Sequence, residues 1–324
     1  MKQLILLICF PLQVVCQNTI GFPDIINYPK QSYKAGLQNW DIKQDKNGIV
    51  YFANNEGLLS FDGKYWNNHP LPNKTNVRSV EIGPANRIYV GGQDELGYFA
   101  PAANGRLLYY SLIEQIAAKD RSFGDVWDIV AFKGNIYFRS LKKIFKFTDR
   151  AVAVFNAPSE WDFLGECNGK LFAHDYAAGL LVFENDIWAP VFTENILPVN
   201  DPVTGIISIQ KDSAIITTLK NGLFLLSDTR IAVLPSVNNQ LFKNERVYAA
   251  TSINKDWIAL ATNNNGIYIT DTKGNIIQSF SRTEGLQNNN VLSILLDRER
   301  NLWLGLDNGI DLITYNSSIK QIKP

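Results

Sequence analysis

The chain repeats itself, and this self-similarity constrains the fold more than any single motif does. A triad of short β-rich runs, separated by turn residues, occurs seven times along the 324 residues. In the first copy the three runs are residues 39–42, 48–53 and 56–61. The first runs of the seven copies begin near residues 39, 77, 126, 160, 203, 247 and 291. Each copy has room for a further strand after the third, so the pattern predicts four-stranded units.

A turn glycine precedes the third run in most copies and gives the register of the repeat. The marker residues are Gly57, Gly97, Gly179, Gly222, Gly266 and Gly309, with Lys143 in this place in the third copy. Neighbouring markers are 36 to 46 residues apart. A period of about 40 to 45 residues built from strands is typical of propellers, whereas leucine-rich, ankyrin and TPR repeats have shorter periods and helices. Only residues 112–119 have a helical period. We therefore predict an all-β fold, a seven-bladed β-propeller of four-stranded antiparallel blades, over residues 39–324.

Closure of the ring requires the first and last blades to meet. A blade whose middle strands are apolar on both faces buries them by stacking radially on its neighbours. Residues 25–28, within the N-terminal segment 17–38, resemble an outer strand followed by a crossover and are suited to pair with the seventh blade. Residues 318–322 are the alternative for the same place, and the sequence leaves both open.

The N-terminus has the pattern of a secretory signal peptide. Lys2 is followed by the apolar run 4–10, and residues 14–16 are small enough for signal peptidase. A membrane anchor needs about 20 apolar residues, and Pro11 and Gln13 interrupt this run. We expect residues 1–16 to be removed and the rest to be periplasmic or extracellular, with lipidation of Cys16 as the lesser alternative. Cleavage leaves Cys167 alone, so the domain depends on its own core rather than on a disulfide.

The seventh copy, through residues 291–297, 301–305 and 307–310, resembles the repeat of the two-component regulator propeller family. Residues 40–61 resemble it nearly as well, copies two, five and six moderately, and copies three and four depart from it. The likeness covers roughly residues 39–315. It implies a periplasmic propeller that senses a ligand, often a carbohydrate. In that family a second propeller or a triple-tyrosine β-sandwich, a transmembrane helix, and a histidine kinase or DNA-binding output follow. Because the sequence contains none of these later parts, the resemblance implies a receptor fragment or a stand-alone propeller. A homodimer is expected only in the full receptor.

The sequence offers little chemistry for an enzyme. Its two histidines, His69 and His174, have no metal-ligand spacing, and neither a Gly-x-Ser-x-Gly elbow nor a phosphate-binding glycine loop is present. Lys plus Arg and Asp plus Glu both number 31, so no basic field exists to attract nucleic acid. We predict no catalytic residue, no metal and no cofactor.

One constellation points to binding. Alignment of the first runs places Trp40, Arg78, Trp127, Trp161, Thr204, Tyr248 and Leu292 at equivalent positions, with an Asp directly after each tryptophan. In a propeller these positions and the turns between the second and third strands open on the same face around the central channel. The turns supply Asp94, His174, Asn263 and Asp307. Aromatic rings there are suited to stack on sugars, and carboxylates and amides are suited to bind hydroxyl groups. The structural alternative is that Trp and Asp only pack between blades and hold the next turn.

These observations favour a domain that senses an oligosaccharide or another small ligand. A propeller lyase or glycosidase is the first alternative, and it requires two carboxylates, or a tyrosine and a basic partner, facing each other across the channel mouth. A protein-docking propeller is the second.

Overall fold

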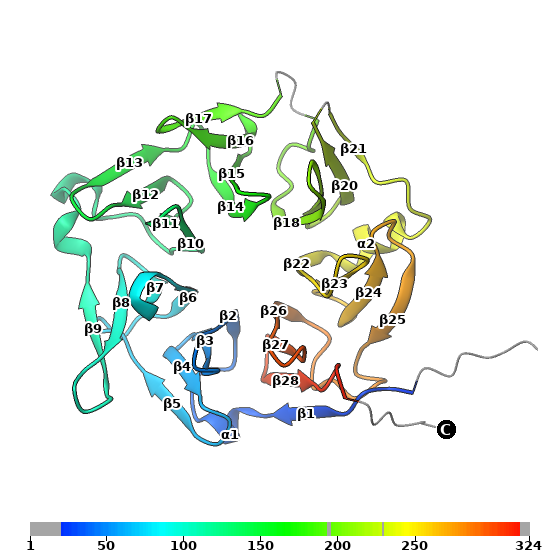
Figure 1. Ribbon diagram of the computed structural model, residues 1–324, viewed down its shortest axis with the longest axis horizontal. Helices are drawn as coiled ribbons and strands as arrows, with labels where there is room; N and C mark the ends of the chain where they lie inside the picture. Colours follow the sequence, from blue (N-terminus) through cyan, green and yellow to red (C-terminus); the bar gives the residue numbers. More distant parts are fainter. Residues whose placement is uncertain (1–20, 193–195, 229, 318–324) are drawn as a thin grey trace, which may run out of the picture.

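The computed structural model describes residues 21–192, 196–228 and 230–317. The predicted signal peptide, residues 1–16, lies outside the described residues, as do residues 318–322. Within them, the chain forms seven four-stranded antiparallel sheets arranged in a ring (Figure 1). The predicted seven-bladed β-propeller is confirmed.

The innermost strand of each blade faces the ring axis, and the second strand pairs with it. The innermost strands of blades 1 to 7 are β2 (Asn39–Gln44), β6 (Val77–Ile82), β10 (Asp128–Phe132), β14 (Trp161–Cys167), β18 (Val203–Gln210), β22 (Val247–Ser252) and β26 (Val291–Leu296). The second strands are β3 (Val50–Asn54), β7 (Ile88–Gly92), β11 (Asn135–Arg139), β15 (Lys170–Asp175), β19 (Ser213–Thr218), β23 (Trp257–Thr262) and β27 (Leu302–Leu306).

The third and fourth strands form the outer half of each blade. The third strands are β4 (Gly57–Phe61), β8 (Leu96–Pro101), β12 (Lys143–Phe147), β16 (Gly179–Glu184), β20 (Gly222–Ser227), β24 (Ile267–Asp271) and β28 (Ile310–Ile313). The outermost strands of blades 1 to 6 are β5 (Trp66–His69), β9 (Leu107–Ser111), β13 (Val152–Asn156), β17 (Ile187–Pro190), β21 (Ile231–Val233) and β25 (Ile276–Phe280).

The N-terminal strand closes the ring. Strand β1 (Ile25–Tyr28) pairs antiparallel with β28 and supplies the outermost strand of blade 7 (Figure 1). Of the two segments that the sequence offered for this place, the structure shows the N-terminal one. The ring of Tyr28 stacks on Trp303 of blade 7 at 5.8 Å and contacts Phe61 of blade 1 at 5.5 Å, so this strand also joins the first blade to the last.

The core consists of seven clusters of buried side chains, as far as the described residues show, and each cluster lies between two neighbouring blades. Strand β3 shows why the clusters lie between blades. Val50 and Phe52 pack against blade 7, whereas Tyr51 and Ala53 pack against blade 2. Successive side chains of a strand point to opposite faces, so an almost fully apolar middle strand is stable only with a blade on each side. Burial of both faces is what drives the sequence into a ring.

Within the part of the chain that the structure describes, short helices occur only in the connections between strands. Residues 112–119, where a helical period was expected, contain two 3-10 turns, Ile113–Gln115 and Ala118–Asp120. Helix α1 (Lys30–Tyr33) follows β1, and helix α2 (Asn239–Glu245) joins blades 5 and 6. The sequence did not predict α2. Asn239 at its start accepts a hydrogen bond from the backbone N–H of Leu223 at 2.8 Å, which fixes the helix against blade 5.

Candidate functional site

A cavity of about 730 Å³ lies on the ring axis, and the innermost strands of all seven blades line it. It is open to solvent and mixed in character, with tryptophan, tyrosine and aliphatic side chains beside eight charged ones. This is the place where the sequence predicted ligand binding, and it is our candidate site.

A β-bulge at the start of the innermost strand determines which side chains reach the cavity. In blades 1, 2, 4, 5, 6 and 7 the pairing of the first and second strands slips by one residue at the same place. A bulge leaves one residue without a partner and re-aims its side chain. The bulged residues are Trp40, Arg78, Asp162, Thr204, Tyr248 and Leu292, and all of them line the cavity. In blade 3 Trp127 has this position, and its backbone N–H donates to the carbonyl oxygen of Arg139 at 2.8 Å.

Trp40, Arg78 and Trp127 form one cluster across blades 1 to 3. The guanidinium carbon of Arg78 lies 4.2 Å from the ring centre of Trp40 and 5.1 Å from that of Trp127. The two indoles meet edge to face at 5.9 Å. Arg78 Nε also lies 3.3 Å from the Asp125 carboxylate, and the indole N–H of Trp40 donates to Asn55 at 2.7 Å. Cation–π contacts and the ion pair thus hold both rings in place before any ligand arrives.

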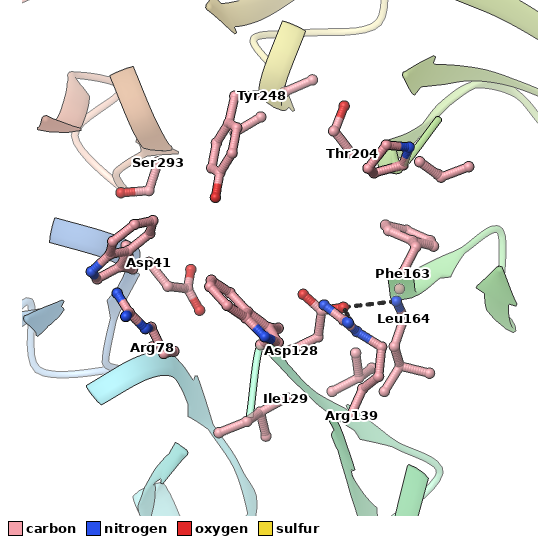
Figure 2. A pocket seen from close by; sticks show the side chains of 18 of the residues that line it. Asp41, Arg78, Asp128, Ile129, Arg139, Phe163, Leu164, Thr204, Tyr248 and Ser293 are labelled. Carbon is pink, nitrogen blue, oxygen red and sulfur yellow. Dashed lines mark hydrogen bonds and ion pairs between the residues drawn. The ribbon is translucent and has the colours of Figure 1, made fainter. Parts of the chain in front are cut away.

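Tyr248 extends into the cavity from blade 6. Its hydroxyl points towards the side of the cavity where Arg78 and Asp128 lie (Figure 2), and it makes no hydrogen bond within the described part of the chain. Burial raises the pKa of the Tyr248 phenol, and the charge of Asp128 raises it further. The phenol therefore stays protonated at neutral pH and is able both to donate and to accept a hydrogen bond.

The aspartates after the inner tryptophans hold the blades together. Each accepts a hydrogen bond from the backbone of the following blade: Asp41 from Val80 at 3.0 Å, Asp128 from Leu164 at 2.8 Å (Figure 2) and Asp162 from Val203 at 3.2 Å. Burial raises the pKa of Asp41 to about 6. Burial also raises the pKa of Asp162, against the opposing effect of His174. In all three Trp–Asp pairs, the aspartate thus forms a hydrogen bond to the next blade. In two of the three, the tryptophan ring also lines the cavity.

The predicted position of Trp161 at the channel mouth is wrong. The bulge in blade 4 falls at Asp162, one residue later than the sequence alignment placed it. Trp161 therefore points between blades, is 1% exposed, and packs in the core between blades 3 and 4 against Trp188. It does not reach the cavity. Its role is the blade packing that was the structural alternative.

His174 lies behind the cavity wall rather than in it. It is 1% exposed, and its Nδ1 lies 2.7 Å from Oδ1 of Asp162. Its Nε2 has no hydrogen-bond partner among the described residues. Asp162 stands between the imidazole and the cavity, so His174 is able to position that carboxylate but is not part of the cavity lining.

The three remaining turn residues also lie outside the cavity lining. Asp94 accepts hydrogen bonds from the backbone N–H groups of Phe123 and Gly124, each at 2.7 Å. The Asn263 amide donates to Asn290 at 2.9 Å, and Asp307 accepts from Gln38 at 2.6 Å. The side chains of Asp94, Asn263 and Asp307 are thus engaged in contacts within the chain. A ligand-binding role for Asp94, His174, Asn263 and Asp307 stays a prediction without direct support from the geometry.

The structure adds charged residues that the sequence reasoning missed. Lys43 and Glu81 lie in the cavity three residues after Trp40 and Arg78 and form an ion pair at 3.0 Å. Arg139, at the end of β11, pairs with Asp128 at 2.5 Å and donates to the carbonyl of Trp161 at 2.9 Å. Lys43 and Glu81 could have been predicted from the repeat register, because they are at equivalent places in two copies. Arg139 was not, because it comes from a second strand.

The described residues contain no group of three or more His, Cys, Asp or Glu side chains placed to hold a metal ion. Within the same residues no helix is both long and apolar enough to cross a bilayer.

The repeat and the fold agree with known proteins. Residues 285–308 match the two component regulator propeller family. No curated protein matches the chain by sequence. Among solved structures, the extracellular domain of BT4673 from B. thetaiotaomicron, described as a hybrid two component system, is 19% identical with a TM-score of 0.73. The match covers 92% of this chain but only 41% of that one, so the chain spans about two fifths of the length of this relative.

Two lyase propellers are also similar. A streptogramin B lyase is 16% identical with a TM-score of 0.66, over 89% of this chain and 96% of that one. A virginiamycin B lyase from Staphylococcus aureus, bound to quinupristin, is 15% identical with a TM-score of 0.68, over 90% and 99%. At these identities the likeness shows the fold and not the activity. The resemblance carried by the seventh copy is confirmed, and the chain is a seven-bladed β-propeller with a two component regulator propeller repeat in its last blade.

Proposed function

We propose that this chain is an extracytoplasmic sensor domain of a signalling receptor and that it binds an oligosaccharide in the axial cavity. The observation that carries the proposal is the axial cavity itself, into which Trp40, Trp127 and Tyr248 project from three blades. The regulator propeller repeat and the likeness to an extracellular domain described as part of a two component system support the sensing role.

The cavity has the two kinds of group that sugar recognition requires. Aromatic rings provide apolar surface for the C–H faces of a pyranose, and a hydroxyl such as that of Tyr248 provides directional hydrogen bonding. The rings of Trp40 and Trp127 are already held by Arg78, so little side-chain freedom is lost when a ligand binds. Binding to preorganised groups costs less free energy than ordering mobile ones.

Signalling requires that the propeller be coupled to further receptor domains. We propose such domains, a triple-tyrosine β-sandwich or a kinase or DNA-binding output, as its partners, and dimerisation in the full receptor. The predicted signal peptide and the extracellular nature of the BT4673 domain support a periplasmic or extracellular location.

A thermal-shift screen of the purified domain against a broad oligosaccharide panel tests the proposal. A ligand that binds only the folded state raises the melting temperature. We expect at least one glycan to do so, and we expect Tyr248→Phe to weaken its affinity about tenfold because a hydrogen bond from a buried hydroxyl is lost. Tyr65→Phe is the matched control, since Tyr65 is 58% exposed and does not line the cavity. A folded protein that no glycan in the panel stabilises contradicts the proposal.

One observation favours a lyase as the second candidate. Tyr248 points towards Arg78 and Asp128 across the cavity (Figure 2), which is the kind of pairing that a propeller lyase requires, and lyase propellers share the fold. The raised pKa of Tyr248 argues against it as a general base, because the phenol is protonated at neutral pH. A lyase forms a product with a new double bond that absorbs in the ultraviolet. If the native protein forms such a product and Tyr248→Phe does not, the chain is a lyase rather than a sensor.

A further inference from the structure

The axial cavity is acidic although the whole chain is neutral. Its charged lining consists of three cationic side chains, Lys43, Arg78 and Arg139, and five carboxylates, Asp41, Glu81, Asp128, Asp162 and Glu166. The difference is two negative charges, in a chain whose formal net charge is zero. The excess is therefore concentrated at the site and is not a property of the surface as a whole.

Each of the three cations is already neutralised by a carboxylate. The ion pairs are Lys43 with Glu81 at 3.0 Å, Arg78 with Asp125 at 3.3 Å and Arg139 with Asp128 at 2.5 Å. The charge of Glu81 raises the pKa of Lys43, as expected for a pair that stabilises both charges. An anionic ligand would have to compete with a carboxylate of the chain for every one of these cations.

The other three carboxylates have no lysine or arginine within ion-pair distance among the described residues. Asp41 accepts hydrogen bonds from the backbone N–H groups of Ile42 and Val80, and Glu166 accepts one from Gly169. Backbone donors satisfy oxygen lone pairs but do not cancel a full charge. Asp162 has His174 as its neighbour, which offsets its charge only when the imidazole is protonated.

A cavity of this kind discriminates by charge. An incoming carboxylate or sulfate would lose its water beside like charges, which is unfavourable, whereas an amine would gain an ion pair and a hydroxyl would gain a hydrogen bond. The Tyr248 hydroxyl, which has no hydrogen-bond partner among the described residues, gives neutral and amine-bearing ligands a donor and an acceptor at the same place.

We propose that the axial cavity takes neutral or amine-bearing sugars and excludes uronic and sulfated ones. This inference rests on the proposed function, since it specifies the ligand class of the same site.

Isothermal titration of the domain against matched sets of oligosaccharides tests the inference. Each set has one backbone and carries a hydroxyl, an amine, a carboxylate or a sulfate at the same carbon. We expect every binder to be a neutral or an amine-bearing member. A uronic or sulfated member that binds as tightly as its neutral counterpart, with loss of binding in Tyr248→Ala, overturns the inference while leaving sugar sensing intact. Absence of binding by all members overturns the proposed function and, with it, the inference.

Charge removal provides the second readout. Asp41→Asn and Asp162→Asn keep an oxygen that accepts the hydrogen bond from the next blade, but each removes a negative charge. We expect at least one of them to lower the affinity for an amine-bearing ligand relative to its neutral counterpart about fivefold, because a charge-assisted hydrogen bond is replaced by a neutral one. Asp271→Asn is the matched control, since Asp271 also accepts backbone N–H groups but lies at the end of β24, outside the cavity lining. An unchanged ratio in both cavity variants overturns the inference.

Discussion

The carboxylate of Asp128 in blade 3 accepts a hydrogen bond from the backbone N–H of Leu164 in blade 4, at 2.8 Å (Figure 2). The same oxygen pairs with Arg139, whose side chain is 6% exposed. One side chain therefore joins two blades and neutralises a buried cation at the cavity wall. The site and the ring closure share residues, so changes in the cavity have to be separated from changes in stability.

Asp128→Ala is expected to lower the free energy of unfolding by about 3 kcal/mol, because it leaves the guanidinium of Arg139 buried without its counter-charge. Urea unfolding followed by tryptophan fluorescence measures this. Asp62→Ala is the matched control. Asp62 also accepts two backbone hydrogen bonds but lies in an exposed turn, and its loss should have a much smaller effect. Equal effects of the two changes would show that the buried pair contributes nothing.

Trp161→Ala is expected to cost about 3 to 5 kcal/mol, the range for removal of a large buried ring from a core. Its side chain is 1% exposed between blades 3 and 4. Trp127→Ala should cost less, because that ring is only partly buried and faces the cavity. Thermal unfolding of both variants measures the two losses of stability. A larger loss for Trp127 than for Trp161 would contradict the placement of the bulge at Asp162.

The sequence predicted the ring but not this one-residue shift, and the reason is local. The repeat register follows from apolar runs and marker glycines, which recur in nearly every copy. Bulges leave no comparable pattern, because the residue that occupies the bulge differs from blade to blade, from Trp40 to Leu292. Alignment on tryptophan was therefore correct in blades 1 and 3 and failed in blade 4.

Tyr28→Ala is expected to lower the free energy of unfolding by about 2 kcal/mol, because Tyr28 contacts rings of both the first and the last blade. Ile26→Ala, on the same strand, is the control. Ile26 is 38% exposed, and its removal should matter little. Chemical denaturation of the two variants measures the difference. If the two losses are alike, β1 does not close the ring through the packing of Tyr28.

Asp41 gives a pH-dependent contribution to stability. Its pKa rises from 3.8 to about 6 on folding, because burial penalises the charged form. The protonated side chain favours the folded state fully below about pH 4, and this contribution is lost as the pH rises through 6. Asp41→Asn cannot ionise. The stability of the native protein minus that of Asp41→Asn should therefore fall between pH 4 and pH 7, as measured by urea unfolding at each pH. A difference that rises or stays constant would contradict the burial of this carboxylate.

Part of the candidate site was also predictable. The position of Trp40, Arg78, Trp127 and Tyr248 around the axis follows from the repeat, because equivalent residues of a ring meet at its centre. The turn residues Asp94, Asn263 and Asp307 were expected at the same mouth, but short polar turns bond to their own neighbours first. Arg139 pairs with Asp128 because the end of β11 lies beside the start of β10. No spacing in the sequence shows how these two strand ends are placed along the ring axis.

Whether a sugar binds in the axial cavity is tested most directly by a crystal structure of the domain with a glycan that raises its melting temperature. We expect electron density for the sugar inside the axial cavity, in contact with the Tyr248 hydroxyl and with at least one of Trp40 and Trp127. Density for the sugar on the outer strands or between blades, with the axial cavity holding only solvent, would contradict it.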